Sequence, residues 1–511
     1  RSLNEAEQQE KLQTFIQEDR KIGFDLSQAP LFRLTLIQCS TQKYYFVWSQ
    51  HHILIDGWCL PIVLKDVLNA YEDIKQWRKV QLKSRRPYRD YIAWLEQQNL
   101  NQAETFWKEY LHNVEEPTHL SFKNIIEKNQ DKDYDTYYLD FSSEETEGIK
   151  QFAQQHNLTL NTVFQGIIGI VLRTYTQQQE ILLGVTVSGR SINLSGVEEM
   201  VGLFINTLPL RMNFRKGDGI VSFLKDLQEQ TQRLNDYAYA PLAQVQSWSG
   251  LNQRLFDVIF VFENYPIDEA AFVEDSTFSL KGIQGIEKTE YPLTVVVVPG
   301  KQLHLNLSYQ TEHFDEEFTK KFSSHIRQVL QNIVQNTQNS SHSDSPIHTF
   351  SLLTPQEKNQ LLIEWNDTKT EYPKEKTVHE LFEEQVEKTP NNIAVVYENK
   401  ELTYQQLNEK ANQLAHYLKT LGVGPDTLVA IAVERSLEMI IGLLGILKAG
   451  GAYVPLDPSY PQERLQFMLE DTKIPILLTQ SFLQATFKNY SGILLSLDKK
   501  WETIQQFPKK N

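Results

Sequence analysis

The feature that most constrains the fold is a histidine pair between two segments of different hydrophobic period. The apolar run at residues 44–48 predicts a buried strand. The pair, His51 and His52, follows it. Apolar residues then recur at the helical spacing, which predicts a helix with one apolar face: Leu60, Val63, Leu64, Val67, Leu68 and Tyr71. Because functional side chains often lie on loops held by a rigid scaffold, we expect a site at this junction.

The geometry of the pair limits what it can do. If the strand continues through the pair, His51 and His52 point to opposite faces, so one can enter a cavity while the other packs. Asp56 and Gly57 then predict a turn, in which the carboxylate fixes the loop through a charged partner. A metal site is disfavoured, because ligands on opposite faces do not close on one ion and no nearby Cys or His completes a tetrahedral set.

Composition excludes several classes of protein. A chain of 511 residues is too long for one core, so we expect several domains. A net charge of -15 argues against a nucleic-acid partner, because phosphate binding needs clustered Lys and Arg. Two cysteines, Cys39 and Cys59, favour a reducing, cytoplasmic setting. No apolar run approaches the roughly 20 residues of a membrane span, and the first residues do not resemble a signal peptide, so no membrane partner is expected.

The order of the other elements indicates an α/β protein. The pattern predicts a polar helix at residues 1–20 and a half-buried strand at residues 32–36. Ser142 and Glu145 are typical of a capped helix start. A buried helix at residues 162–174 and a strand at residues 181–187 follow, and such alternation predicts an α/β lobe.

Two motifs carry a resemblance to a known family. Residues 51–57 have the pattern HHxxxDG and resemble the signature of condensation domains of non-ribosomal peptide synthetases, within the chloramphenicol acetyltransferase-like superfamily. Residues 201–211 resemble the family motif VGxFxNTLPxR over its whole length. Further segments are similar to the family at residues 24–33, 88–94, 106–111, 235–237 and 255–266. The aromatic residues of segments 88–94 and 106–111 are expected to be core.

The resemblance implies four parts. A first condensation lobe, truncated at its N-terminus, is expected at residues 1–125, with the polar stretch 115–132 as lobe connection, and a second lobe at residues 126–345. The Ser-, Asn- and Gln-rich stretch from Asn336 onward indicates flexibility, and residues 346–375 are expected to be a linker. Residues 376–511 resemble the start of an AMP-forming adenylation domain, with motifs at residues 402–407 and 447–457. A helix, a glycine turn and a short strand explain the second motif.

The same resemblance implies an acyltransferase that forms amides. The amine of one carrier-bound aminoacyl thioester would attack another thioester, so the partners would be upstream and downstream peptidyl carrier domains with phosphopantetheine arms. His52 is expected to be essential, as a general base, by orienting the amine or by stabilising the tetrahedral intermediate. Asp56 is expected to form a structural ion pair, with Arg211 favoured over Arg190. Asn264 is expected either near a tunnel or in a turn.

The same resemblance indicates which cofactors to expect and which alternative functions remain. No bound cofactor or metal is expected. ATP and Mg²⁺ are expected only in a complete adenylation domain, because no Ser/Thr/Gly-rich phosphate loop follows Asp457. This part is therefore expected to be inactive. A non-catalytic carrier-docking fragment and an epimerisation domain remain alternatives, whereas a cyclisation domain is disfavoured. The context of residues 55–60 resembles domains that accept L-configured donors.

Overall fold

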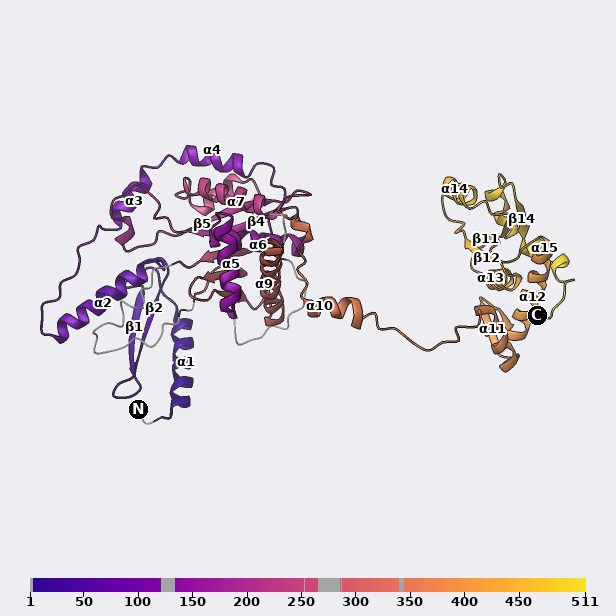
Figure 1. Ribbon diagram of the computed structural model, residues 1–511, viewed down its shortest axis with the longest axis horizontal. Coiled ribbons are helices and arrows are strands. Elements are labelled where there is room, and N and C mark those ends of the chain that lie inside the picture. Colours follow the sequence, from indigo (N-terminus) through magenta and orange to yellow (C-terminus); the bar gives the residue numbers. More distant parts are fainter. Residues whose placement is uncertain (1–2, 121–133, 252, 265–284, 286, 340–343) are drawn as a thin grey trace. The chain divides into compact units, whose positions relative to one another are not determined.

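The computed structural model describes residues 3–120, 134–251, 253–264, 285, 287–339 and 344–511. The chain divides into two compact units, Arg1–Asp367 and Thr368–Asn511 (Figure 1). The division falls within the segment expected to be a linker. Most of the expected lobe connection and residues 265–266 of the family segment lie outside the described residues.

The first lobe is built on a two-stranded antiparallel ribbon. Helix α1 (Glu5–Ile22) is followed by β1 (Phe32–Gln38) and β2 (Tyr44–Gln50), and α2 (Cys59–Lys75) comes after the histidine pair. The strand predicted at residues 44–48 is confirmed as part of β2, but the expectation that it is buried is wrong, because each of these residues is exposed or half-buried. Helix α1 covers the face that carries Arg33, which forms an ion pair with Asp19 at 2.7 Å. The apolar side chains of the other face are therefore largely exposed: Phe32, Leu34, Leu36, Tyr44 and Phe46.

Two helices lead from the first lobe into the core of the second. Helix α3 (Arg89–Glu96) and helix α4 (Leu100–Tyr110) carry the aromatic segments expected to be core. That expectation is confirmed, because Tyr91 and Trp107 are buried. Trp107 and Leu111 belong to the same buried cluster as the sheet of the second lobe, so this core includes residues before 126.

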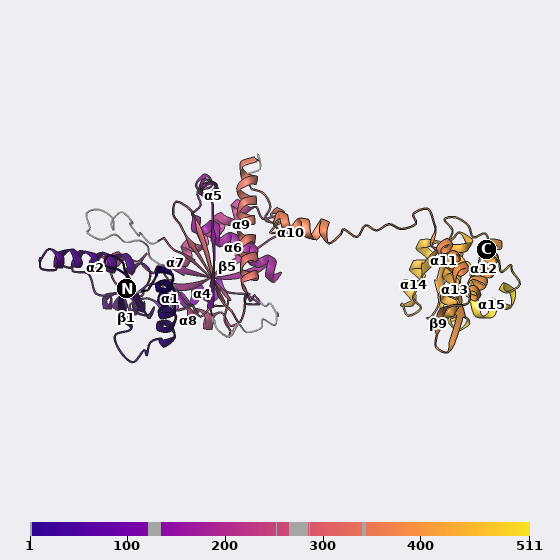
Figure 2. The ribbon, with the colours of Figure 1, turned by 90° about the horizontal axis from the view of Figure 1, so that it is seen from below.

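The second lobe contains a six-stranded mixed sheet. Its strand order is β3-β8-β7-β6-β4-β5, in which β4, β6 and β7 are parallel and the other pairs antiparallel. The strands are β3 (Tyr134–Asp140), β4 (Glu180–Val187), β5 (Asn206–Asn213), β6 (Val258–Phe262), β7 (Leu293–Val298) and β8 (His304–Gln310). Helices α5 (Ser143–Gln155), α6 (Leu160–Thr176) and α9 (Glu316–Asn339) pack against one another, and α6 and α9 contact the sheet (Figure 2). Helices α7 (Ile220–Asn235) and α8 (Leu242–Trp248) contact β5.

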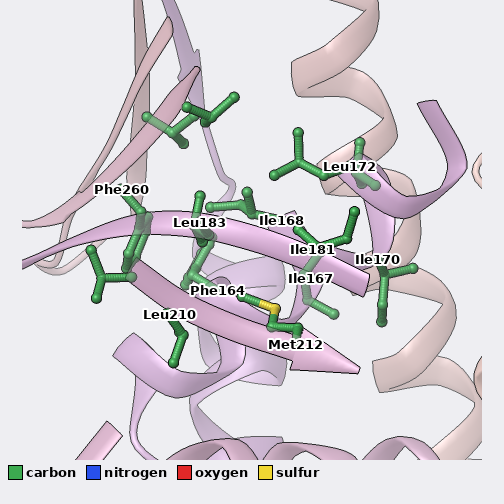
Figure 3. Packing of buried hydrophobic residues seen from close by; sticks show 14 of the residues in the cluster. Phe164, Ile167, Ile168, Ile170, Leu172, Ile181, Leu183, Leu210, Met212 and Phe260 are labelled. Atoms are coloured by element: carbon green, nitrogen blue, oxygen red, sulfur yellow. The ribbon is translucent and has the colours of Figure 1, made fainter. Parts of the chain in front are cut away.

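Local sequence explains the centre of this lobe. The predicted capped start of α5 is confirmed, since Ser142 and Glu145 form a reciprocal capping box. The predicted buried helix and strand correspond to α6 and β4. The five successive residues 181–185 of β4 are buried, which is expected for a strand covered on both faces. Figure 3 shows side chains of α6 packed against those of β4, β5 and β6.

The segment after the sheet remains attached to the second lobe. Helix α9 continues to Asn339, beyond the start of the stretch expected to be flexible. Ile347 and Phe350 lie in the buried cluster of this lobe, so packing extends past residue 345. A short helix, α10 (Pro355–Asn359), follows; its Glu357 carboxylate accepts from Thr354 and lies 3.1 Å from His325 of α9.

The second unit has its own α/β core. A four-stranded parallel sheet has the order β12-β11-β13-β14, with β11 (Leu428–Ala432), β12 (Ala452–Pro455), β13 (Ile476–Thr479) and β14 (Ile493–Ser496). Helices α11 (Val378–Lys388), α12 (Tyr404–Thr420), α13 (Leu437–Ala449), α14 (Gln462–Thr472) and α15 (Leu497–Ile504) accompany it, with a hairpin of β9 (Ile393–Tyr397) and β10 (Lys400–Thr403). Gly450, with φ of 92°, ends α13 before β12, which confirms the expected helix, glycine turn and strand. No helix in the described ranges of either unit combines the length and apolarity that a membrane span requires.

Candidate active site

The histidine pair lies in a turn rather than in the strand. Strand β2 ends at Gln50, so the alternation assumed for the pair stops before His52. The His51 N–H donates to the Leu31 carbonyl at 2.9 Å, its Nδ1 accepts from the Ile53 N–H at 3.2 Å, and its ring meets the Phe24 ring edge-on. The His52 side chain is exposed, and its ring makes no hydrogen bond to any described residue. His51 therefore shapes the turn, whereas the His52 side chain is open to solvent.

Asp56 fixes this turn to the second lobe. Its carboxylate is fully buried and lies 3.3 Å from the Arg190 guanidinium, which is itself 7% exposed. The other carboxylate oxygen accepts from the Phe204 N–H at 2.9 Å. The Arg190 guanidinium also donates to the carbonyls of Val197 and Met200, at 2.7 and 3.0 Å. The ion pair thus joins the histidine turn to the loop that follows β4.

The prediction that Arg211 pairs with Asp56 is wrong. Arg211 lies on β5, where its side chain forms an ion pair with Glu180 of β4. It also donates to the carbonyls of Tyr110 and His112, at 2.8 and 3.0 Å. The antiparallel register explains the choice, because Arg211 faces Leu182 and so lies diagonally opposite Glu180.

Cys59 is a member of the site that sequence reasoning missed. Its thiol is fully buried and accepts from Arg190 Nη2 at 3.2 Å and from the Gly202 N–H at 3.3 Å, while Asp56 Oδ1 lies 3.3 Å away. Burial raises the pKa of the Cys59 thiol, which keeps it protonated and able to donate to the Gly202 carbonyl at 3.2 Å. The available signal in the sequence was the position of Cys59, two residues after the end of the motif at Gly57.

The two remaining predicted site residues, Gly57 and Asn264, both make backbone hydrogen bonds. Gly57 is buried beside Asp56, and its carbonyl accepts from the Leu60 N–H at 3.2 Å. Asn264 is exposed after β6, and its N–H donates to the Phe262 carbonyl at 3.1 Å. This backbone contact fits the turn role, and a contact with a substrate stays a prediction.

Two cavities of the structure lie away from the pair. One, of about 580 Å³, is lined by residues of α6, α9 and the segment 347–353. The other, of about 410 Å³, lies in the second unit between α14 and the residues around Tyr490. His52 lines neither. The described part of the chain holds no group of three or more His, Cys, Asp or Glu placed to bind a metal ion.

Comparison with known proteins identifies the class that this fold and site define. Residues 1–362 match the family model of the condensation domain, and residues 382–507 match that of AMP-binding enzymes. The chain therefore belongs to the condensation-domain family of non-ribosomal peptide synthetases. After its condensation domain, the chain continues into the N-terminal part of an AMP-binding enzyme domain. This confirms the resemblance carried by residues 51–57 and 201–211.

Curated relatives are far longer than this chain. Bacitracin synthase 3 of Bacillus licheniformis is 40% identical over 480 residues, which cover 93% of this chain and 8% of that protein. Gramicidin S synthase 2 of Aneurinibacillus migulanus is 39% identical over 490 residues, 95% of this chain and 11% of that protein. The chain thus spans about a tenth of the length of the relatives it matches.

Solved structures share the fold. The four-domain non-ribosomal peptide synthetase holo-AB3403, bound to AMP and glycine, aligns with a TM-score of 0.70 at 20% identity, over 97% of this chain and 39% of that one. The starter condensation domain of rhizomide synthetase RzmA, in complex with C8-CoA, aligns with a TM-score of 0.56 at 19% identity, over 68% of this chain and 78% of that one. At these identities the likeness concerns the fold alone.

Proposed function

We propose that the first unit forms an amide between two carrier-bound acyl groups, with His52 as the catalytic residue. One observation carries the proposal: His52 is exposed in a turn whose buried Asp56 is fixed to the second lobe. The fixed turn holds an imidazole where two lobes meet while leaving it accessible to reactants. Such preorganisation is what positioned catalysis requires.

The proposed reaction is the attack of an amine on a thioester, for which the protein must supply at most a base, correct orientation and stabilisation of the tetrahedral intermediate. The amine nitrogen of the acceptor attacks the thioester carbonyl carbon of the donor, a C–N bond forms, the C–S bond breaks and the donor arm leaves as a thiol. An α-amino group with an ordinary pKa near 7.8 is roughly one third unprotonated at pH 7.5. A base at His52 would therefore take a proton during attack rather than before it, and such a step contributes about 10²- to 10⁴-fold. Orientation of the amine or stabilisation of the tetrahedral intermediate would be comparable in size.

The partners of this reaction are peptidyl carrier domains on both sides. Each would deliver its substrate on a phosphopantetheine arm, so the arms belong to the carriers and not to this chain. Membership of the condensation-domain family supports this assignment. ATP and Mg²⁺ would serve a complete adenylation domain, in which the segment at residues 382–507 would form one part.

The test uses two carriers loaded with an aminoacyl donor and an aminoacyl acceptor. Mass spectrometry is expected to show a dipeptidyl carrier with the full chain and at least a hundredfold less with His52→Ala. His313→Ala is the matched control, because His313 is a half-exposed histidine of the same unit, beside Glu312. Equal product from all three proteins would contradict the proposal.

Two other outcomes separate the alternatives. Carriers that bind the chain without any product would favour the docking fragment. Inversion of the α-carbon of a loaded amino acid without amide formation would favour the epimerisation domain, because that reaction moves a proton and leaves the thioester intact.

A further inference from the structure

The turn that carries His52 is held by the backbone of one loop of the second lobe. This loop, residues 200–204, lies between a short 3₁₀ turn and β5, and we call it the clamp loop. The Asp56 N–H donates to the Gly202 carbonyl at 3.3 Å, and the Phe204 N–H donates to the Asp56 carboxylate at 2.9 Å. The position of Asp56, and of the turn before it, therefore depends on where the clamp loop lies.

Tyr88 contacts this same loop at three successive residues. Its hydroxyl donates to the Leu203 carbonyl. Its ring meets the Phe204 ring edge-on, with centroids 5.2 Å apart. It also lies directly over Gly202, where a Cβ atom would approach the Tyr88 ring to 2.0 Å. Tyr88, which directly precedes α3, therefore fixes the position of the clamp loop through contacts with three of its residues.

We propose that Tyr88 is a positioning residue for the amide-forming reaction, acting through the clamp loop on Asp56 and hence on His52. The proposal rests on the proposed function of His52. Tyr88 touches no reacting atom in this account, and its effect is transmitted by two backbone contacts. Burial raises the pKa of Tyr88, so its hydroxyl stays protonated and remains a donor to Leu203.

The chain provides a matched control on α3. Tyr91 is buried and its ring also packs on Phe204, with centroids 4.5 Å apart. Unlike Tyr88, its hydroxyl has no hydrogen-bond partner among the residues that the structure describes. Tyr88→Phe and Tyr91→Phe therefore remove the same atom from neighbouring rings, but only the first removes a contact with the backbone of the clamp loop.

The experiment measures kinetics and hydrogen exchange of the full chain. With loaded carriers, Tyr88→Phe is expected to lower kcat about tenfold or more with KM within about twofold, because misplacement of a catalytic group affects the chemical step. Hydrogen exchange of peptides covering residues 200–206 is expected to become faster, and the melting temperature to change little. Tyr91→Phe is expected to match the unaltered chain in all three measurements.

Each other outcome decides against the proposal. An unchanged kcat for Tyr88→Phe, a rise in KM alone, or equal losses for both variants would show that Tyr88 is not a specific positioning residue. If the unaltered chain makes no amide, the proposed function fails separately. Hydrogen exchange then decides whether the Tyr88 hydroxyl holds the clamp loop, and unchanged exchange in Tyr88→Phe would overturn that contact as well.

Discussion

The buried ion pair of Asp56 and Arg190 gives the most informative perturbation of this protein. Asp56→Ala removes a fully buried carboxylate and leaves the Arg190 guanidinium, 7% exposed, without its counter-charge. The Phe204 N–H loses its acceptor at the same time. Breaking one side of a buried pair costs about 3–5 kcal/mol, because the remaining charge stays out of water. We expect the free energy of unfolding of the first unit to fall by about this amount.

A double-mutant cycle tests the partner as well as the magnitude. Asp56→Ala combined with Arg190→Ala is expected to show a coupling energy of about 0.5–3 kcal/mol, as for side chains in direct contact. Asp56→Ala combined with Arg211→Ala is expected to be additive within about 0.5 kcal/mol, since Arg211 pairs with Glu180. The assay is urea unfolding, monitored by the hydrogen exchange of peptides from the first unit. The second unit then does not contribute to the measured free energy of unfolding.

Two results would refute this reasoning. If Asp56→Ala lowered the free energy of unfolding by less than about 1 kcal/mol, the pair would stabilise the fold no more than an exposed ion pair does. Stronger coupling to Arg211 than to Arg190 would contradict the arrangement of the loop after β4. Asp56→Asn, which can still accept from Phe204 but carries no charge, is expected to fall between the unaltered chain and Asp56→Ala.

Two further predictions concern stability. Hydrogen bonds from Arg327 lower the pKa of Glu145 to about 2, so this carboxylate stabilises the fold above pH 4.5 and the gain is lost as the pH falls toward 2. Urea unfolding should show Glu145→Gln less stable by up to about 3 kcal/mol at pH 7 and nearly equal at pH 2. A Cβ at Gly189 (φ 64°) would lie 2.0 Å from the Phe204 carbonyl oxygen, whereas a Cβ at Gly196, which also has a positive φ (79°), would meet no atom within 4 Å. Gly189→Ala should therefore lower the melting temperature well below that of Gly196→Ala. Equal melting temperatures would contradict the clash.

The sequence by itself determined the local elements and the family. The period of the apolar residues predicted α2, α6 and β4, and Ser142 with Glu145 predicted the start of α5, because these signals depend on neighbours within one or two turns. The motifs at residues 51–57 and 201–211 indicated the condensation-domain family, which the family model confirms. Such information is local, and no knowledge of distant contacts is needed to recover it.

The tertiary structure decided which distant groups meet. Arg190 reaches Asp56 because Gly189, with φ of 64°, turns the chain after β4, whereas the β4–β5 register directs Arg211 to Glu180. The end of β2 at Gln50 likewise places His52 in an exposed turn. Charge and residue type name the possible partners of a buried group, but the distance between elements far apart in the chain selects one of them.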